Sequence, residues 1–323
     1  MNDRRLLLCA PRGFCAGVNR AIETIDRLLR ATSETVYVRK QIVHNRFVVE
    51  SFERRGVVFV DDVEDVPEGA LVVLSAHGIS PDVRSRAKAL GQRIVDATCP
   101  LVTKVHREVQ AFVRDGYSVL LVGHGGHEEV EGTMGQVPGA VSLVQDVEDV
   151  RSAVVSDPQR VAVVTQTTLS VAETRDVVGA LKRRFPALRE PPKGDICYAT
   201  ESRQAAVRAL AAISQAIIVV GSSNSSNSGS LRDAAAGCGA CAYLTDDPSE
   251  IEPAWLGDVQ TLGVTAGASS PEALVKSILA RVKMIEPAFS VENFGEPEPD
   301  IVFLEPPELR HYQPMKELID ANY

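Results

Sequence analysis

Long apolar runs and an excess of positive charge are both missing from this sequence. No apolar run approaches the ~18 residues that a membrane-spanning helix needs. The first residues lead only into an apolar run of strand length, so we expect no signal peptide. The formal net charge of −9 argues against nucleic acid as a main partner. We therefore expect a cytoplasmic protein that binds neither a membrane nor nucleic acid.

Cysteine is scarce, and its spacing does not match an ordinary metal-binding motif. The six cysteines are Cys9, Cys15, Cys99, Cys197, Cys238 and Cys241. A cytosolic chain keeps its thiols reduced, so metal binding or catalysis is favoured over disulfides. Cys238 and Cys241 form a C-x-x-C that no second such pair accompanies, and Cys9 lies within an apolar run. We interpret these three as structural residues.

The other three cysteines, Cys15, Cys99 and Cys197, each precede an amphipathic helical pattern. The pattern is clearest at Cys99, where a short apolar run at 93–95 ends and a helical pattern begins. Unpaired backbone N–H groups and the positive end of a helix dipole would then lie beside the sulfur. We expect them to lower the thiol pKa and favour the thiolate. The three cysteines recur at roughly 90-residue intervals, which indicates a unit repeated three times.

The repeated unit predicts an α/β fold, because strand-length apolar runs alternate with helical patterns along the 323 residues. We place three pseudo-equivalent units with parallel sheets at residues 1–98, 99–196 and 197–285. We expect the tail, residues 286–323, to pack back on the first unit through a strand at 301–306. Functional loops gather beyond the carboxyl ends of parallel strands. Three such edges facing inward would bring the cysteines together, whereas a solenoid stack would separate them.

Three thiolates that share one open position suit few metal centres. Zinc with three cysteines and a histidine is one possibility. A cubane iron–sulfur cluster whose fourth iron is open to substrate is the other. Soft thiolates favour both, and the absence of C-x-x-C spacing among the three disfavours structural zinc and ferredoxin-type electron transfer.

Polar loops follow the predicted strands at matching positions of the repeats. Three of them carry histidines, namely His44, His77 and His127, and a loop at 221–230 is rich in serine, asparagine and glycine. Imidazoles, hydroxyls and free backbone N–H groups bind anions. We therefore predict an anion site that suits a phosphate-type substrate.

A carboxyl group and a hydroxyl group in the second unit complete the predicted site. Glu129 follows His127 by two residues, and Thr167 lies in the matching polar exit of a later strand. A carboxyl group beside a bound hydroxyl can deliver a proton to it. Thr167 can form a hydrogen bond with the same hydroxyl.

Several motifs carry a resemblance to a known family. They are residues 11–18 (PRGFCAGV), 42–45 (IVHN), 75–78 (SAHG), 96–102 (DATCPLV), 129–136 (EVEGTMGQ), 165–170 (TQTTLS), 195–200 (DICYAT), 224–228 (NSSNS) and 263–269 (GVTAGAS). With these motifs the sequence resembles the 4-hydroxy-3-methylbut-2-enyl diphosphate reductases, which complete the methylerythritol phosphate route to isoprenoids. The resemblance covers nearly the whole chain, and the motif set is highly specific.

The resemblance implies a trefoil of three units around a 4Fe–4S cluster that Cys15, Cys99 and Cys197 hold, with the fourth iron open to the hydroxyl oxygen of the substrate. The residues implied to bind the diphosphate are His44, His77, His127, Ser225, Ser226, Asn227 and Ser269. Glu129 would be the proton source, and Thr167 would orient the hydroxyl. A ferredoxin or flavodoxin type donor would supply two electrons, and the products would be isopentenyl and dimethylallyl diphosphate. We expect a monomer or a weak homodimer.

Some positions depart from the family pattern while all implied contact residues are kept. They are Gln41, Glu128, Glu201, Ser202 and Ser230. Glu128 stands where the family usually has proline. Because these positions flank the ligand site, a divergent paralogue remains an alternative. A non-redox hydratase that uses the open iron as a Lewis acid, and a non-catalytic iron–sulfur or zinc protein, are further alternatives.

Overall fold

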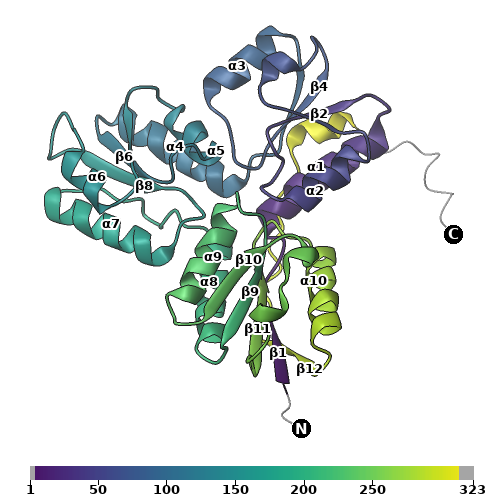
Figure 1. Ribbon diagram of the computed structural model, residues 1–323. Coiled ribbons are helices and arrows are strands. Elements are labelled where there is room, and N and C mark those ends of the chain that lie inside the picture. Colours follow the sequence, from purple (N-terminus) through teal and green to yellow (C-terminus); the bar gives the residue numbers. More distant parts are fainter. Residues whose placement is uncertain (1–3, 313–323) are drawn as a thin grey trace.

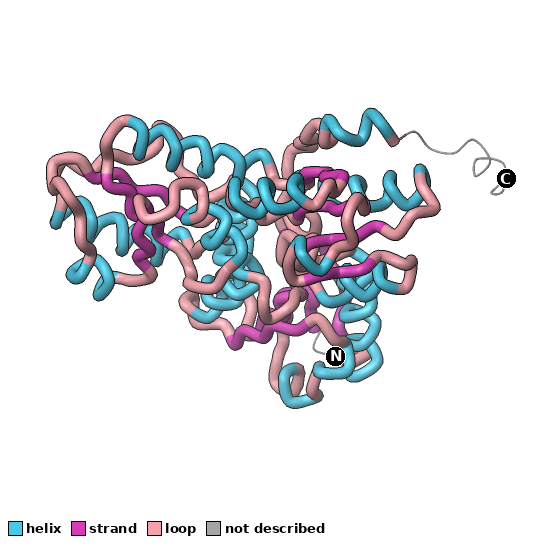
Figure 2. The backbone as a smooth tube through the Cα atoms, turned by 90° about the horizontal axis from the view of Figure 1, so that it is seen from above, coloured by secondary structure: helices cyan, strands magenta, loops and turns pink. Residues whose placement is uncertain are grey.

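The computed structural model describes residues 4–312 and shows three lobes around a common centre (Figure 1). Each lobe is built on its own sheet, and the strands form separate groups with helices around them (Figure 2). Every pair of neighbouring strands among the described residues is parallel. The predicted α/β fold with parallel sheets is confirmed. None of the described helices is long and apolar enough to span a membrane.

The first lobe has a four-stranded sheet in the order β3-β2-β4-β5. Its strands are β2 (Val36–Arg39), β3 (Val58–Val60), β4 (Leu71–Leu74) and β5 (Arg93–Asp96), and its helices are α1 (Ala16–Ala31), α2 (Arg46–Glu53) and α3 (Pro81–Ala89). The apolar face of α1 buries Ile25 and Leu28 against Val38 and Val73 of the sheet. This is the amphipathic pattern expected of a helix that covers a parallel sheet.

The second lobe has a three-stranded sheet in the order β7-β6-β8. Its strands are β6 (Ser118–Val122), β7 (Val141–Val144) and β8 (Val161–Thr165), and its helices are α4 (Pro100–Arg114), α5 (Glu128–Met134), α6 (Val147–Ser152) and α7 (Val171–Arg184). All five residues of β8 are buried, as expected for a strand that helices cover on both faces.

The third lobe has a five-stranded sheet in the order β10-β9-β11-β1-β12. Its strands are β1 (Arg4–Cys9), β9 (Ala216–Val220), β10 (Cys241–Thr245), β11 (Thr261–Ala266) and β12 (Phe289–Phe294), and its helices are α8 (Tyr198–Ala211), α9 (Ser226–Ala236) and α10 (Glu272–Ile285). Cys9 is fully buried in this lobe. Burial raises the pKa of its thiol to about 11, which agrees with a structural role.

The sheets divide the chain differently from the three segments expected at 1–98, 99–196 and 197–285. Strand β1 begins the chain but pairs with β11 and β12 of the third lobe, not with the strands that follow it. Its apolar residues Leu6 and Leu8 pack in the core of that lobe. The third lobe therefore takes a strand from each end of the chain, and equal spacing of the cysteines does not reveal this.

Only the part of the tail after β12 returns to the first lobe, and the strand predicted at 301–306 is wrong. That segment has no regular secondary structure, and a short 3-10 helix, η4 (Pro307–His311), follows it. Leu309 of η4 is buried in the core of the first lobe, and Arg27 of α1 forms an ion pair with Glu305. No strand partner is needed because the tail packs through side chains. Residues 313–323 of the expected tail lie outside the described part.

Candidate active site

Each of the three selected cysteines is the N-cap residue of a long helix. Cys15 precedes α1, Cys99 precedes α4 and Cys197 precedes α8, as the sequence predicted. None of their side chains forms a capping hydrogen bond with its own helix. All three line one cavity where the lobes meet. The structure therefore brings together thiols from distant positions in the chain, and the solenoid arrangement is excluded.

Gly17, in the first turn of α1, gives the sulfurs room. A Cβ atom built on Gly17 would lie 2.7 Å from the Sγ of Cys99 and 3.9 Å from the Sγ of Cys15. The first distance is shorter than real contacts allow. Glycine is therefore required here if Cys99 is to point into the cavity beside Cys15.

The expected lowering of the thiol pKa does not hold for two of these cysteines. Burial raises the pKa of Cys99 to about 12 and that of Cys197 to about 11, and the neighbouring thiol of Cys15 adds to both shifts. Backbone N–H groups of Leu101 and Val102 act in the opposite direction on Cys99 but are outweighed. The prediction counted the helix dipole and neglected desolvation. A bound cationic metal centre is the partner that would stabilise these thiolates.

The number and placement of the thiols bear on which metal centre this cavity could hold. A single tetrahedral zinc ion with bonds of about 2.3 Å would hold its thiolates within ~3.8 Å of one another. Among the described residues, the only group of three or more metal-ligating side chains whose ligand atoms all lie within 4.8 Å of one another is His44, His77 and Glu128. The three cysteines do not form such a compact group. Among the described residues, the cavity lining offers no fourth thiol.

Glu129 and Thr167 form a pair in the dry interior of the cavity. Glu129 is 2% exposed, and Thr167 is 4% exposed. The backbone N–H of Thr167 donates to Oε1 of Glu129 at 2.7 Å, and the Oγ1 of Thr167 lies 3.0 Å from Oε2. Burial raises the pKa of Glu129 to about 7, although the hydrogen bonds from Thr167 oppose this shift. Glu129 can therefore hold a proton near neutral pH.

The rings of the three predicted histidines contact one another in the lining of the cavity. The rings of His44 and His77 stack with their centroids 3.9 Å apart, and His127 meets both edge-on. Burial lowers the pKa of His77, and it lowers that of His127 to about 3. The Nδ1 of His127 accepts a hydrogen bond from the backbone N–H of Glu129 at 3.1 Å, which leaves Nε2 as the donor. These rings can bind an anion through N–H groups.

Loops of the third lobe place hydroxyl and amide groups in the same cavity lining as the histidines. Ser225, Ser226 and Asn227 lie where β9 leads into α9, and Ser269 follows β11. The Oδ1 of Asn227 accepts the backbone N–H of Ala268 at 2.9 Å, which fixes its amide. The Oγ of Ser269 donates to the backbone carbonyl of His44 at 2.9 Å and links the first and third lobes. All twelve residues predicted for the site line this one cavity.

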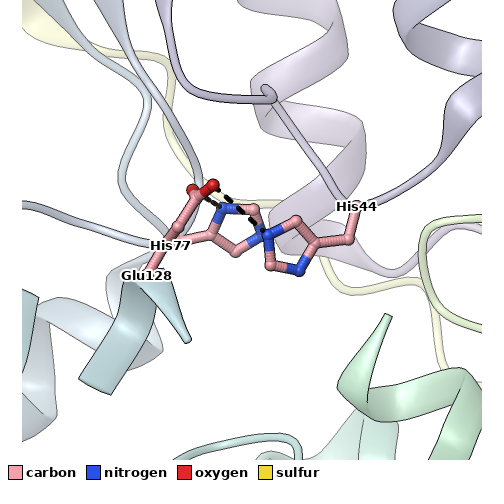
Figure 3. Close-up of side chains that lie close together, drawn as sticks. All are labelled: His44, His77 and Glu128. Carbon is pink, nitrogen blue, oxygen red and sulfur yellow. Dashed lines mark hydrogen bonds and ion pairs between the residues drawn. The ribbon is translucent and has the colours of Figure 1, made fainter. Parts of the chain in front are cut away.

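The sequence reasoning missed several residues that lie in or near the cavity. Thr200 is fully buried, and its Oγ1 lies 3.1 Å from the Sγ of Cys197. Its position one helical turn after the cysteine was a usable signal. Phe303 of the tail also lines the cavity, and nothing in its local sequence pointed to it. Glu128 was noted only as a departure, but its carboxylate reaches both His44 and His77 (Figure 3).

Other departures from the family pattern contact the rim or the outer side of the site. Gln41 accepts a hydrogen bond from Asn224 at 2.9 Å, and the Oγ of Ser230 donates to the carbonyl of Thr168 at 3.1 Å. Ser202 donates to Glu298, beside the buried ion pair of Glu298 with Arg203. Glu201 is exposed at the start of α8. Of the five departures, Glu128 alone contacts residues predicted to bind the substrate.

The sequence model of the LytB protein family matches residues 6–283. The chain belongs to the LytB family. A relative from Burkholderia mallei, "4-hydroxy-3-methylbut-2-enyl diphosphate reductase 2", is 53% identical over 281 residues, which cover 87% of this chain and 86% of the relative. A LytB relative from Hahella chejuensis, "4-hydroxy-3-methylbut-2-enyl diphosphate reductase", is 52% identical and covers 95% of this chain and 98% of its own length.

A solved structure extends this likeness to the fold. The E-1-hydroxy-2-methyl-but-2-enyl-4-diphosphate reductase from Plasmodium falciparum superposes with a TM-score of 0.92 and 36% sequence identity. The match covers 96% of this chain and 98% of that chain. This agreement supports the trefoil arrangement of lobes that the sequence resemblance implied.

Proposed function

We propose that this protein is a 4-hydroxy-3-methylbut-2-enyl diphosphate reductase, which removes the hydroxyl group of its allylic diphosphate substrate with two electrons and two protons and releases water. The products are isopentenyl and dimethylallyl diphosphate. The observation that carries the proposal is a single cavity lined by three helix-capping thiols, by Glu129 and by anion-binding groups. The names of the LytB relatives support the same reaction.

The cofactor of this proposal is a 4Fe–4S cluster held by Cys15, Cys99 and Cys197. The donor set fits, because three thiols line one cavity, they do not form the compact group that a single ion would need, and the described lining offers no fourth thiol. When bound, such a cluster supplies electrons and one iron without a protein ligand, which acts as a Lewis acid. We propose a ferredoxin or flavodoxin type donor as the source of the electrons.

The diphosphate would bind between the histidines and the loops of the third lobe. His44, His77 and His127 offer ring N–H groups, and Ser225, Ser226, Asn227 and Ser269 offer hydroxyl and amide groups. This arrangement directs the hydroxyl end of the substrate toward the thiols.

Glu129 would supply the proton that converts the departing hydroxyl to water. The backbone N–H of Thr167 occupies Oε1, so the proton of the neutral acid belongs on Oε2. That oxygen faces the Oγ1 of Thr167 at 3.0 Å. The threonine hydroxyl can form hydrogen bonds with this carboxyl group and with the substrate hydroxyl, which orients the substrate hydroxyl beside the acid. Because both side chains are buried, bulk water does not compete for the proton.

An anaerobic assay tests the proposal. The purified protein is incubated with (E)-4-hydroxy-3-methylbut-2-enyl diphosphate and a strong one-electron reductant, and the products are identified by mass spectrometry. We expect both five-carbon diphosphates, and none without the reductant. Conversion of the substrate that does not depend on the reductant would instead support a hydratase. A colourless protein that carries zinc would refute the cluster.

A further inference from the structure

A second group of metal-ligating side chains, which contains no cysteine, lies beside the cavity that His44 and His77 line. His44 follows β2, His77 follows β4, and Glu128 is the first residue of α5. Each offers one ligand atom, and these atoms all lie within 4.8 Å of one another. We propose that His44, His77 and Glu128 form a binding site for a divalent transition-metal cation such as Zn²⁺.

The three side chains already point toward one another. The Nδ1 of His77 lies 2.9 Å from Oε2 of Glu128, and the Nε2 of His44 lies 3.6 Å from Oε1 (Figure 3). Tetrahedral ligands around one zinc ion, each about 2.0–2.2 Å from the metal, lie about 3.3–3.6 Å apart. Small movements of the side chains therefore suffice to admit an ion.

The chemistry of the donors suits a transition metal. Two imidazole nitrogens and one carboxylate oxygen form a set that binds zinc and iron(II) and leaves open positions. The rings of His44 and His77 stack at 3.9 Å, so protonating both would place two positive charges face to face. At least one ring is therefore neutral, and a neutral imidazole is the form that binds metals.

The charge of the cavity gives the ion a role. Among the described residues that line the cavity, none is a lysine or an arginine. Glu128 lies outside that lining, in an adjoining hollow that His44 and His127 also line and that contains Arg232. A diphosphate bound beside the histidines would still meet the Glu128 carboxylate, which contacts His44 and His77. A divalent cation between the carboxylate and the diphosphate would turn this repulsion into attraction, because its open positions can accept phosphate oxygens. This role rests on the proposed function, whereas the metal site does not.

Zinc titration of the cluster-loaded protein under anaerobic conditions tests the site. The exposed pair Cys238 and Cys241 would also bind zinc, so the experiment uses a background with Cys238→Ser and Cys241→Ser. In this background we expect one zinc equivalent, and Glu128→Gln should weaken its binding at least tenfold. The matched control is Glu131→Gln, an exposed carboxylate on the same helix, which should leave zinc affinity unchanged.

X-ray absorption at the zinc edge identifies the ligands. We expect nitrogen and oxygen neighbours with an imidazole signature and no sulfur. Sulfur neighbours, or equal zinc affinity in the Glu128→Gln variant, would overturn the site. Circular dichroism and iron content verify that the variants are folded and loaded. A protein that binds zinc in this way but does not convert the diphosphate would retain the site and refute the proposed function.

Discussion

Glu128 and Glu129 are adjacent in sequence, yet they lie in opposite electrostatic surroundings. Glu129 lines the cavity beside Thr167, and burial raises its pKa to about 7. Glu128 contacts His44 and His77. Its interactions with these two rings outweigh burial and lower its pKa. Adjacent carboxyl groups whose pKa values are driven apart indicate separate tasks. In the proposed function, Glu129 and the thiols would handle protons and electrons, and the histidines beside Glu128 would bind the anion.

Removing a thiol should have the largest effect, because the proposed cluster would lose one of its three protein ligands. Cys99→Ser should lose most of the bound iron and all measurable turnover, since serine is a poor ligand for a soft metal centre. Iron and sulfide analysis of anaerobically purified protein measures this. Cys238→Ser is the control and should retain full iron, because Cys238 is exposed and remote from the cavity lining. A full iron complement in Cys99→Ser would refute the ligand assignment.

Glu129→Gln should separate proton delivery from cluster binding. We expect turnover to fall roughly 10²–10⁴-fold, the usual contribution of a general acid, while iron content stays unchanged. The amide keeps the shape of the side chain but cannot supply the proton. Steady-state kinetics of the variant, with Glu131→Gln as the exposed control on the same helix, measures the difference. Wild-type turnover in Glu129→Gln would remove Glu129 from the mechanism.

The pH dependence of turnover should report the raised pKa of Glu129. The acid is the active form and is lost as the pH rises through about 7. Above that pH, kcat should fall about tenfold per pH unit. The Glu129→Gln variant should have low activity without this decline. A wild-type profile that is flat from pH 6 to 9, measured with a reductant whose potential is constant over this range, would contradict the assignment.

A smaller effect is expected when Thr167 loses its hydroxyl. Thr167→Val keeps the backbone hydrogen bond to Glu129 but removes the one at 3.0 Å from Oε2. We expect kcat to fall roughly tenfold, the value of one hydrogen bond to a charged or reacting group. Because that bond stabilises the ionised form, the descending limb of the pH profile should also move to higher pH. Thr167→Ser should restore both, and a serine variant as impaired as valine would point to packing instead.

The local sequence predicted well which cysteines and histidines line the cavity. The cysteines were recognisable because each precedes an amphipathic helix, and the histidines because they follow strands at matching places in a repeat. In a parallel sheet these positions share one edge, so pattern alone brings them together. The position of Glu128 was less predictable. The contact of Glu128 with His44 and His77 depends on how the first and second lobes pack, and no local pattern encodes that packing.

Long-range pairing explains the other errors. Strand β1 was assigned to the segment that follows it, but its neighbours β11 and β12 come from the far end of the chain. An apolar run predicts a strand without naming its partners. The apolar residues of the segment 301–306 similarly indicated a strand, whereas the tail is held by Leu309 and the ion pair of Glu305. The thiol pKa was misjudged because desolvation depends on the assembled cavity.

Mössbauer spectroscopy of iron-57-labelled protein, purified without oxygen, tests the central claim most directly. If Cys15, Cys99 and Cys197 surround one cluster, the spectrum should show about four irons, one of which has a distinct environment because it lacks a thiolate. Adding the diphosphate substrate should change the signal of that iron alone. A spectrum with four equivalent irons that ignore the substrate, or a protein without iron, would contradict the account.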